Sequence, residues 1–201
     1  MSSVKYYQEV TLLPGFEIPL YFIWSNVYRQ LHLAFVDCKD ENGSVPYGVS
    51  FPQYQQEKKQ SNLGEKVRVF AASKEALEQL DIKKWLQRLS DYVHVTGIRE
   101  VPDKIIGYSV YRRVHQNNSS EQKARRFLKR HATETASYEE IVSKFIRSPA
   151  KWIQNIPYIK QKSLTNSSSF RLYVEKKECA REALGNFGTY GLSETTTVPE
   201  F

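Results

Sequence analysis

The sequence has little of what marks a metal-binding, disulfide-bonded or secreted protein. Cys38 and Cys179 are the only cysteines among 201 residues, and no CxxC pair or Cys/His ligand spacing occurs. Neither a zinc site nor a disulfide scaffold is therefore indicated. The N-terminus lacks the apolar segment of a signal peptide, and no apolar run approaches the ~20 residues that span a bilayer. We expect a cytoplasmic protein with reduced thiols and no membrane partner.

The common catalytic motifs are missing as well. The sequence contains no Walker loop, no HExxH and no GxSxG, and it lacks paired carboxylates. The glycines of GNFGTYG (185–191) lack the Lys-Ser/Thr of a phosphate-binding loop, so hairpin turns explain them better. We therefore expect no metal and no cofactor.

Negative charge is scarce in the second half of the chain. Residues 1–100 hold 12 Lys/Arg and 12 Asp/Glu, whereas residues 101–201 hold 17 and 10, so the whole net charge of +7 lies there. Between Lys104 and Arg171 the count is 14 positive residues against 4 negative ones. A one-sided positive field of this kind is typical of proteins that bind a polyanion or an anionic membrane surface.

The densest positive charge lies in SSEQKARRFLKRHA (119–132). A serine N-cap and an apolar stripe at helical spacing predict a helix. Only Glu121 offsets its five cations, which are Lys123, Arg125, Arg126, Lys129 and Arg130. Like charges at helical spacing repel one another. Both a solvated basic face and a binding surface for a polyanion account for this pattern.

The first hundred residues predict the element order β-α-β-β-α-β. Apolar spacing indicates strands at 5–13, 47–54, 66–72 and 91–101, and helices at 18–37 and 73–89. This order is that of a ferredoxin-like domain, the fold that also carries the RNA-recognition motif. EKVRVFAA does not match the aromatic RNA-binding run of that motif, so any RNA binding must be built elsewhere.

Beyond Pro102 the pattern changes to strands at 104–114, 156–163, 170–178 and 189–193, with helices at 119–132 and 137–146. We predict an α+β protein of two domains. Residues 1–102 form a ferredoxin-like (RRM-like) domain, and residues 103–201 form a basic domain with an arginine-rich helix.

Four histidines are available for proton transfer: His32, His94, His115 and His131. His94 alternates within a predicted strand, which favours a structural role. His32 lies at the edge of the apolar face of helix 18–37, where packing and catalysis both remain open. A catalytic histidine would suit RNA cleavage without a metal, because the ribose 2′-hydroxyl is the nucleophile and one histidine can move its proton.

Several segments carry a family resemblance by their order and spacing: VYRQLHLAF, YGVSFPQY, RRVHQNN leading into KARRFLKRHA, KQKSLTNSSSFRLYVEKK and FGTYGLSETTTVPEF. Together they resemble the Csy-type endoribonucleases of type I-F CRISPR systems, which cut precursor CRISPR RNA at each repeat. The resemblance runs from the first strand to the last residue. It implies metal-independent cleavage to a 2′,3′-cyclic phosphate and a 5′-hydroxyl, retention of the product hairpin, and assembly with other subunits of the type I-F surveillance complex.

The resemblance also implies roles for individual residues at the cleavage site. The active-site histidine of the family falls on His32, and the serine that holds or activates the 2′-hydroxyl falls on Ser163. The tyrosine that orients the histidine falls on Tyr190. The phenylalanine that stacks against nucleotides near the cut falls on Phe170. Thr165 stands where the family has a further serine near the cut.

The remaining implied roles concern the RNA hairpin. Arg113 and His115 fall on the residues that read the base pair at the foot of the stem, although the family pattern has glutamine where this chain has His115. The helix that enters the major groove falls on Arg125, Arg126, Lys129 and Arg130, with Lys123 on the same helix.

Two other functions remain open from the residues alone. One is a non-catalytic protein that binds RNA hairpins, and the other is a structural protein whose basic half docks on an acidic partner.

Overall fold

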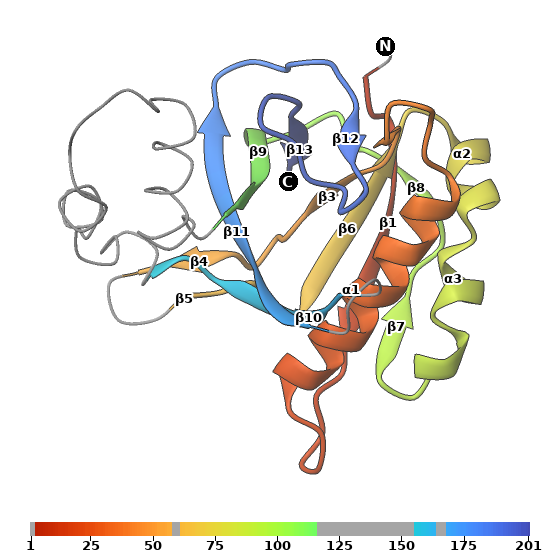
Figure 1. Cartoon of the computed structure of the whole chain (residues 1–201). Helices are drawn as coiled ribbons and strands as arrows, with labels where there is room; N and C mark the ends of the chain where they lie inside the picture. The colour runs from red at the N-terminus through yellow and green to blue at the C-terminus, as the bar shows by residue number, and fades with distance from the viewer. Residues whose placement is uncertain (1–2, 58–60, 116–154, 164–167) are drawn as a thin grey trace, which may run out of the picture.

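The computed structural model describes residues 3–57, 61–115, 155–163 and 168–201 (Figure 1). The predicted helices 119–132 and 137–146 lie outside the described residues, and so does Thr165. No helix in the described part of the chain is long and apolar enough to cross a membrane.

A five-stranded antiparallel sheet is built around β1 (Tyr6–Leu12). Its order is β3 (Gly48–Ser50), β6 (Lys66–Ala71), β1, β7 (Val93–Val95), and β8 (Arg99–Glu100) also pairs with β1. Alternation along β1 buries Gln8, Val10 and Leu12 on one face. The four predicted strands are confirmed, but the segment 91–101 is interrupted because the Thr96 hydroxyl, rather than a strand partner, accepts the backbone N–H of Glu9.

The first predicted helix is confirmed as α1 (Leu20–Asp37). Its apolar residues recur every three or four positions, so one continuous side is buried: Ile23, Trp24, Val27, Tyr28, Leu31, Ala34 and Phe35.

The predicted helix 73–89 is wrong as a single helix. It is divided into α2 (Lys74–Leu80), α3 (Ile82–Trp85) and the 3-10 helix η1 (Gln87–Leu89), because Asp81 at φ 46° is left-handed and ends α2.

A second antiparallel sheet has the order β10 (Tyr158–Lys162), β11 (Ser169–Cys179), β9 (Gly107–Val114), β13 (Val198–Glu200). These strands confirm the ones predicted at 104–114, 156–163 and 170–178. Two short ribbons complete the described strands: β2 (Ser44–Val45) pairs with β12 (Phe187–Gly188), and β4 (Gln55–Gln56) pairs with β5 (Ser61–Asn62).

The strand predicted at 189–193 is wrong, because this segment forms a tight turn. The Gly191 N–H donates to Gly188 O at 2.7 Å, and the Gly188 N–H donates to Leu192 O at 2.9 Å. Gly191 has φ +68°, a left-handed conformation that glycine adopts without steric cost. The turn is held against the first sheet by the Val49 N–H, which donates to Gly191 O at 3.0 Å.

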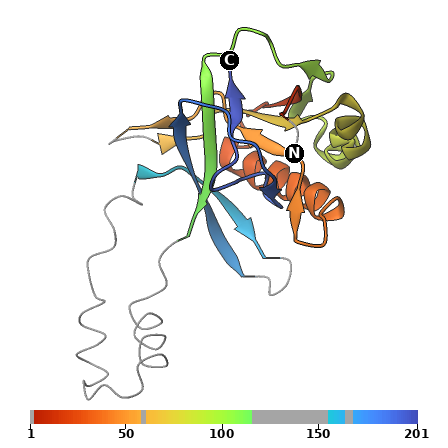
Figure 2. The same cartoon turned by 90° about the horizontal axis from the view of Figure 1, so that it is seen from above.

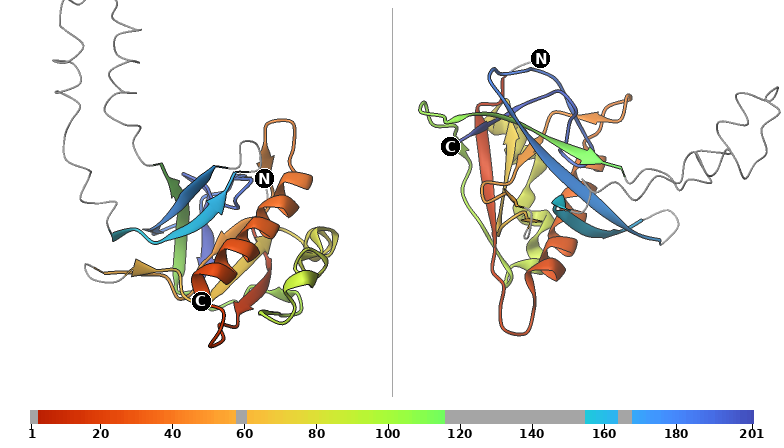
Figure 3. Two further views of the ribbon diagram at one scale, coloured as in Figure 1. Left: turned by 60° about the horizontal axis from the view of Figure 1, so that its bottom comes forward. Right: turned by 90° about the vertical axis from the view of Figure 1, so that its left-hand side faces the viewer.

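Helix α1 lies between the two sheets (Figure 2). The ring centroid of Trp24 on α1 lies 5.6 Å from that of Phe51, and the ring centroid of Phe51 lies 5.4 Å from that of Tyr111 on β9. On β10, the buried Gln161 side-chain amide donates a hydrogen bond to Ser25 O of α1 at 3.1 Å. Strand β10 therefore lies alongside α1 (Figure 3). One cluster of buried side chains thus continues across residue 102. The division into domains at 102 and 103 stays a prediction.

We predict that Gly191→Ala destabilises the protein by about 2–5 kcal/mol. An alanine at φ +68° costs ~1–2 kcal/mol, and its Cβ would lie 2.6 Å from Val49 Cγ1, an overlap that adds about 1–3 kcal/mol. Gly43→Ala is the control, because Gly43 has φ +74° with no atom within 4 Å of the added Cβ. Urea denaturation measures both, and an equal loss in the two variants would contradict the predicted overlap.

Candidate active site

His32 lies on α1 with its imidazole half-buried and directed at the turn that follows β12. The ring nitrogen Nδ1 is 2.8 Å from Thr189 O. A carbonyl oxygen only accepts hydrogen bonds, so Nδ1 must carry the hydrogen in this contact. The neutral ring then has its lone pair on Nε2, and this is the nitrogen available for proton exchange with a ligand.

Tyr190 holds the plane of the imidazole. The two rings are 4.0 Å apart between centroids and 4° from parallel, so they stack face to face. Because Thr189 and Tyr190 are consecutive residues of the turn, one segment supplies both the hydrogen-bond acceptor and the stacking surface. The structure therefore brings the predicted residues His32 and Tyr190 into contact.

Arg113 and Phe170 complete the cluster from the second sheet. The Arg113 guanidinium carbon lies 5.3 Å from the centroid of the Tyr190 ring and 5.4 Å from that of Phe170. Arg113 on β9 is opposite Val174 on β11, and alternation places Phe170 on the same face as Val174. The face of this sheet that covers α1 thus carries the cation and the second aromatic ring to His32.

The surroundings of the imidazole disfavour its charged form. Burial lowers the pKa of His32 below the ordinary histidine value, the hydrogen bond to Thr189 opposes this shift, and the charge of Arg113 adds to it. Burial raises the pKa of Tyr190, with Arg113 acting in the opposite direction. At neutral pH the site therefore holds a neutral imidazole beside a protonated phenol and a fixed positive charge.

Ser163 and His115 lie at the ends of the strands that build the cluster. Ser163 follows β10, and its N–H donates to Ser168 O at 2.8 Å, which closes the β10–β11 connection. Gln161, two residues earlier, is bonded to α1, the helix that carries His32. His115 is exposed directly after β9. The basic residues of segment 119–132 and Thr165 lie outside the described residues.

A further group of cations, which sequence reasoning did not identify, lies on the outward face of β10 and β11. Lys160 is directly opposite Arg171, Lys162 follows on the same face, and all three side chains are exposed. Like charges in directly opposite positions destabilise a sheet. Elsewhere in this sheet the facing pair is Arg112 and Glu175, of opposite charge. No ion pair joins Lys160, Lys162 or Arg171 to another described residue.

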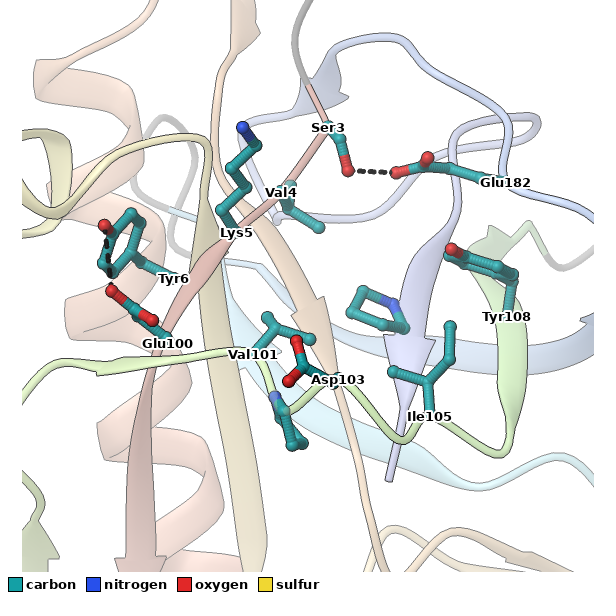
Figure 4. A pocket seen from close by; sticks show the side chains of 12 residues that line it. Ser3, Val4, Lys5, Tyr6, Glu100, Val101, Asp103, Ile105, Tyr108 and Glu182 are labelled. Carbon is teal, nitrogen blue, oxygen red and sulfur yellow. Dashed lines mark hydrogen bonds between the residues drawn. The ribbon is translucent and has the colours of Figure 1, made fainter.

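A cavity of about 420 Å³ lies apart from this cluster, where β8 and β13 approach the N-terminal strand (Figure 4). Its lining includes the carboxylates of Glu100, Asp103 and Glu182, which do not suit a polyanion. Tyr6 donates to Glu100 at 3.4 Å, and the Ser3 hydroxyl donates to Glu182. Among the described residues, no three His, Cys, Asp or Glu side chains gather as a metal site requires.

Comparison with known proteins identifies relatives over almost the whole chain. The family model described as CRISPR-associated protein (Cas_Csy4) matches residues 7–201. The chain is also 27% identical over 202 residues to the CRISPR-associated endonuclease Cas6/Csy4 of Escherichia coli (strain UTI89 / UPEC), which covers 98% of this chain and 100% of that relative.

We predict that His32 titrates below the ordinary histidine range and that Arg113→Gln raises its pKa. The glutamine removes the positive charge that disfavours protonation of the imidazole, so the shift is upward. Arg113→Lys keeps the charge and serves as the control. The measurement is a pH titration of the His32 ring protons by NMR, and an unchanged pKa in Arg113→Gln would contradict the electrostatic coupling.

Proposed function

Because the chain belongs to the Cas_Csy4 family of CRISPR-associated proteins, we propose that it is an endoribonuclease that cuts CRISPR repeat hairpins in precursor CRISPR RNA. The observation that carries this proposal is the half-buried His32 imidazole, stacked on Tyr190 and hydrogen-bonded through Nδ1, with the Arg113 guanidinium over the rings of Tyr190 and Phe170. The proposed reaction requires no metal and no cofactor, because the RNA supplies the nucleophile.

The proposed step is attack of a ribose 2′-oxygen on the adjacent phosphorus. His32 Nε2 accepts the 2′-hydroxyl proton, the new O2′–P bond forms, and the P–O5′ bond breaks. The leaving oxygen takes a proton from solvent water and becomes a 5′-hydroxyl, while the other product ends in a 2′,3′-cyclic phosphate. The His32 imidazolium returns its proton to the solvent. Proton transfer of this kind contributes ~10²–10⁴-fold to rate. Ser163 orients the 2′-hydroxyl, and Tyr190 keeps the imidazole in the plane that the reaction needs.

The proposed RNA contacts divide between the cleavage site and the stem. Arg113 and His115 read the base pair at the foot of the stem, and Phe170 stacks on a nucleotide near the cut, where Thr165 also lies. The exposed pair Lys160 and Arg171 supports phosphate contacts on the outward face of β10 and β11. The helix predicted to enter the major groove contributes Lys123, Arg125, Arg126, Lys129 and Arg130.

We extend the proposal to the architecture and the partners. The antiparallel order β3-β6-β1-β7 supports a ferredoxin-like domain at 1–102, with the remainder forming the basic domain that binds the hairpin. Numerous phosphate contacts favour slow release of the product hairpin. The protein then stays on the mature CRISPR RNA in the cytoplasm and joins the other subunits of the type I-F surveillance complex.

We predict that His32→Ala abolishes cleavage of a labelled repeat hairpin in EDTA while hairpin affinity changes little. The half-buried imidazole supplies a proton acceptor but little contact area. Ser163→Ala reduces the single-turnover rate less, because the substrate already contains the hydroxyl that this serine orients. Cleavage and affinity are measured on the same hairpin, and the product ends are identified as cyclic phosphate and 5′-hydroxyl.

Three outcomes would contradict parts of this proposal. Equal losses of affinity and cleavage in His32→Ala would assign the residue a packing role. Tight hairpin binding by a wild-type protein that does not cleave would indicate a non-catalytic RNA-binding protein. Loss of wild-type cleavage in EDTA would contradict metal independence.

We predict that Arg126→Ala with Arg130→Ala weakens hairpin binding and flattens its salt dependence. Each lost phosphate contact reduces the slope of log affinity against log salt by about 0.7–0.9. The matched control replaces Arg88 and Arg99, two exposed arginines of the first hundred residues, with alanine. An unchanged slope in the first variant would indicate that the basic segment is a solvated face.

A further inference from the structure

Tyr28 binds the same turn as His32, and none of the roles described so far uses it. The two residues are four positions apart on α1, so they lie one above the other on one helix face. The Tyr28 hydroxyl donates to Tyr190 O at 2.8 Å, while His32 Nδ1 is 2.8 Å from Thr189 O. One helix face therefore binds two successive carbonyls of the turn.

The surroundings of Tyr28 keep its hydroxyl protonated, so that it can donate a hydrogen bond. Its side chain is completely buried, and burial together with the neighbouring Tyr190 raises its pKa far above neutral pH, so the hydroxyl keeps its proton. The ring packs 6.0 Å from Phe51 and 6.4 Å from Tyr190, nearly parallel to the latter at 9°. These ring contacts and the complete burial place the hydroxyl oxygen within hydrogen-bond distance of the turn.

We propose that Tyr28 is a positioning residue for catalysis, which holds the 189–190 segment so that His32 Nε2 faces the substrate. The inference rests on the proposed ribonuclease function. An imidazole can rotate by half a turn about its χ2 bond, which would put Cδ2 in the place of Nδ1 and Cε1 in the place of Nε2, so that Nε2 would no longer face the substrate. The bond from Nδ1 to Thr189 O selects one orientation only while that carbonyl stays in place.

Residues 189–191 lie beyond β12, so their position rests on the backbone hydrogen bonds of the turn and on contacts from neighbouring elements. On one side of the turn, Gly191 O accepts a hydrogen bond from the Val49 N–H. The carbonyls of Thr189 and Tyr190 are held from α1, by His32 and Tyr28. Without the Tyr28 hydroxyl, the Tyr190 carbonyl loses its hydrogen bond to α1, and His32 itself supplies the remaining hydrogen bond from α1 to the 189–190 segment. Small displacements of a catalytic group lower the rate strongly, with ~1 Å costing up to about 10²-fold.

The test compares Tyr28→Phe with Tyr47→Phe. Tyr47 is also a buried tyrosine whose hydroxyl donates to a backbone carbonyl, Ala76 O at 3.0 Å, and whose ring stacks on a neighbour, Phe35, at 5.8 Å. Both changes remove one hydroxyl and keep the aromatic ring. We expect similar losses of stability in urea, a cleavage rate about tenfold lower at saturating hairpin for Tyr28→Phe only, and unchanged affinity for a hairpin with 2′-deoxyribose at the cut.

NMR titration of His32 provides a readout that does not depend on activity. The bond to Thr189 raises the pKa of His32, so its loss in Tyr28→Phe lowers that pKa further, whereas Tyr47→Phe leaves it unchanged. An unchanged cleavage rate and an unchanged His32 pKa in Tyr28→Phe, or equal rate losses in both variants, would overturn the inference. A wild-type protein without cleavage would instead contradict the proposed function, and the titration would still decide the role of Tyr28.

Discussion

The attachment of the 188–192 turn to helix α1 is the constraint on which the candidate site depends. His32 and Thr189 are separated by 157 positions in the chain and are joined by one hydrogen bond, and His32 stacks on the ring of the next residue, Tyr190. The turn can approach both α1 and β3 this closely because Gly191 is left-handed and has no side chain to collide with Phe35 on α1 or Val49 on β3. Any change that moves the turn therefore acts on the imidazole as well, since the turn supplies both its acceptor and its stacking partner.

The position of α1 between two sheets determines the electrostatics of the site. One side of the helix is covered by the first sheet, and β10 with β11 covers another, so His32 is left half-buried beside Arg113. Burial and positive charge both favour the neutral imidazole, which is the form that can accept a proton. A phosphate that enters beside Arg113 would offset its charge and ease protonation of the ring. The same cation can thus contribute to binding and to the timing of proton transfer.

Among the described residues, exposed cations and carboxylates gather on different surfaces. Lys160, Lys162 and Arg171 lie together on the outward face of the second sheet, whereas the lining of the separate 420 Å³ cavity includes three carboxylates and one lysine, Lys5. A polyanion is attracted to one of these surfaces and repelled by the other. In the proposed function, the first sheet and α1 supply the chemistry, and the exposed cations of the second sheet supply a surface for RNA.

The amino-acid pattern was sufficient for elements whose apolar spacing is local, such as α1 and β1. The family resemblance pointed to four residues that the structure brings into one cluster, although their roles stay predictions: His32, Tyr190, Arg113 and Phe170. The amino-acid pattern failed to predict the secondary structure at two places where a single residue with a positive φ determines the path of the backbone. Asp81 divides the helix predicted at 73–89, and Gly191 turns the chain where alternating residues had suggested a strand. Tyr28 could have been noticed one helical turn before His32, but nothing local distinguishes its hydroxyl from that of Tyr47. Only the tertiary structure decided that role, because hydrogen bonding to Tyr190 requires two segments 162 positions apart to meet.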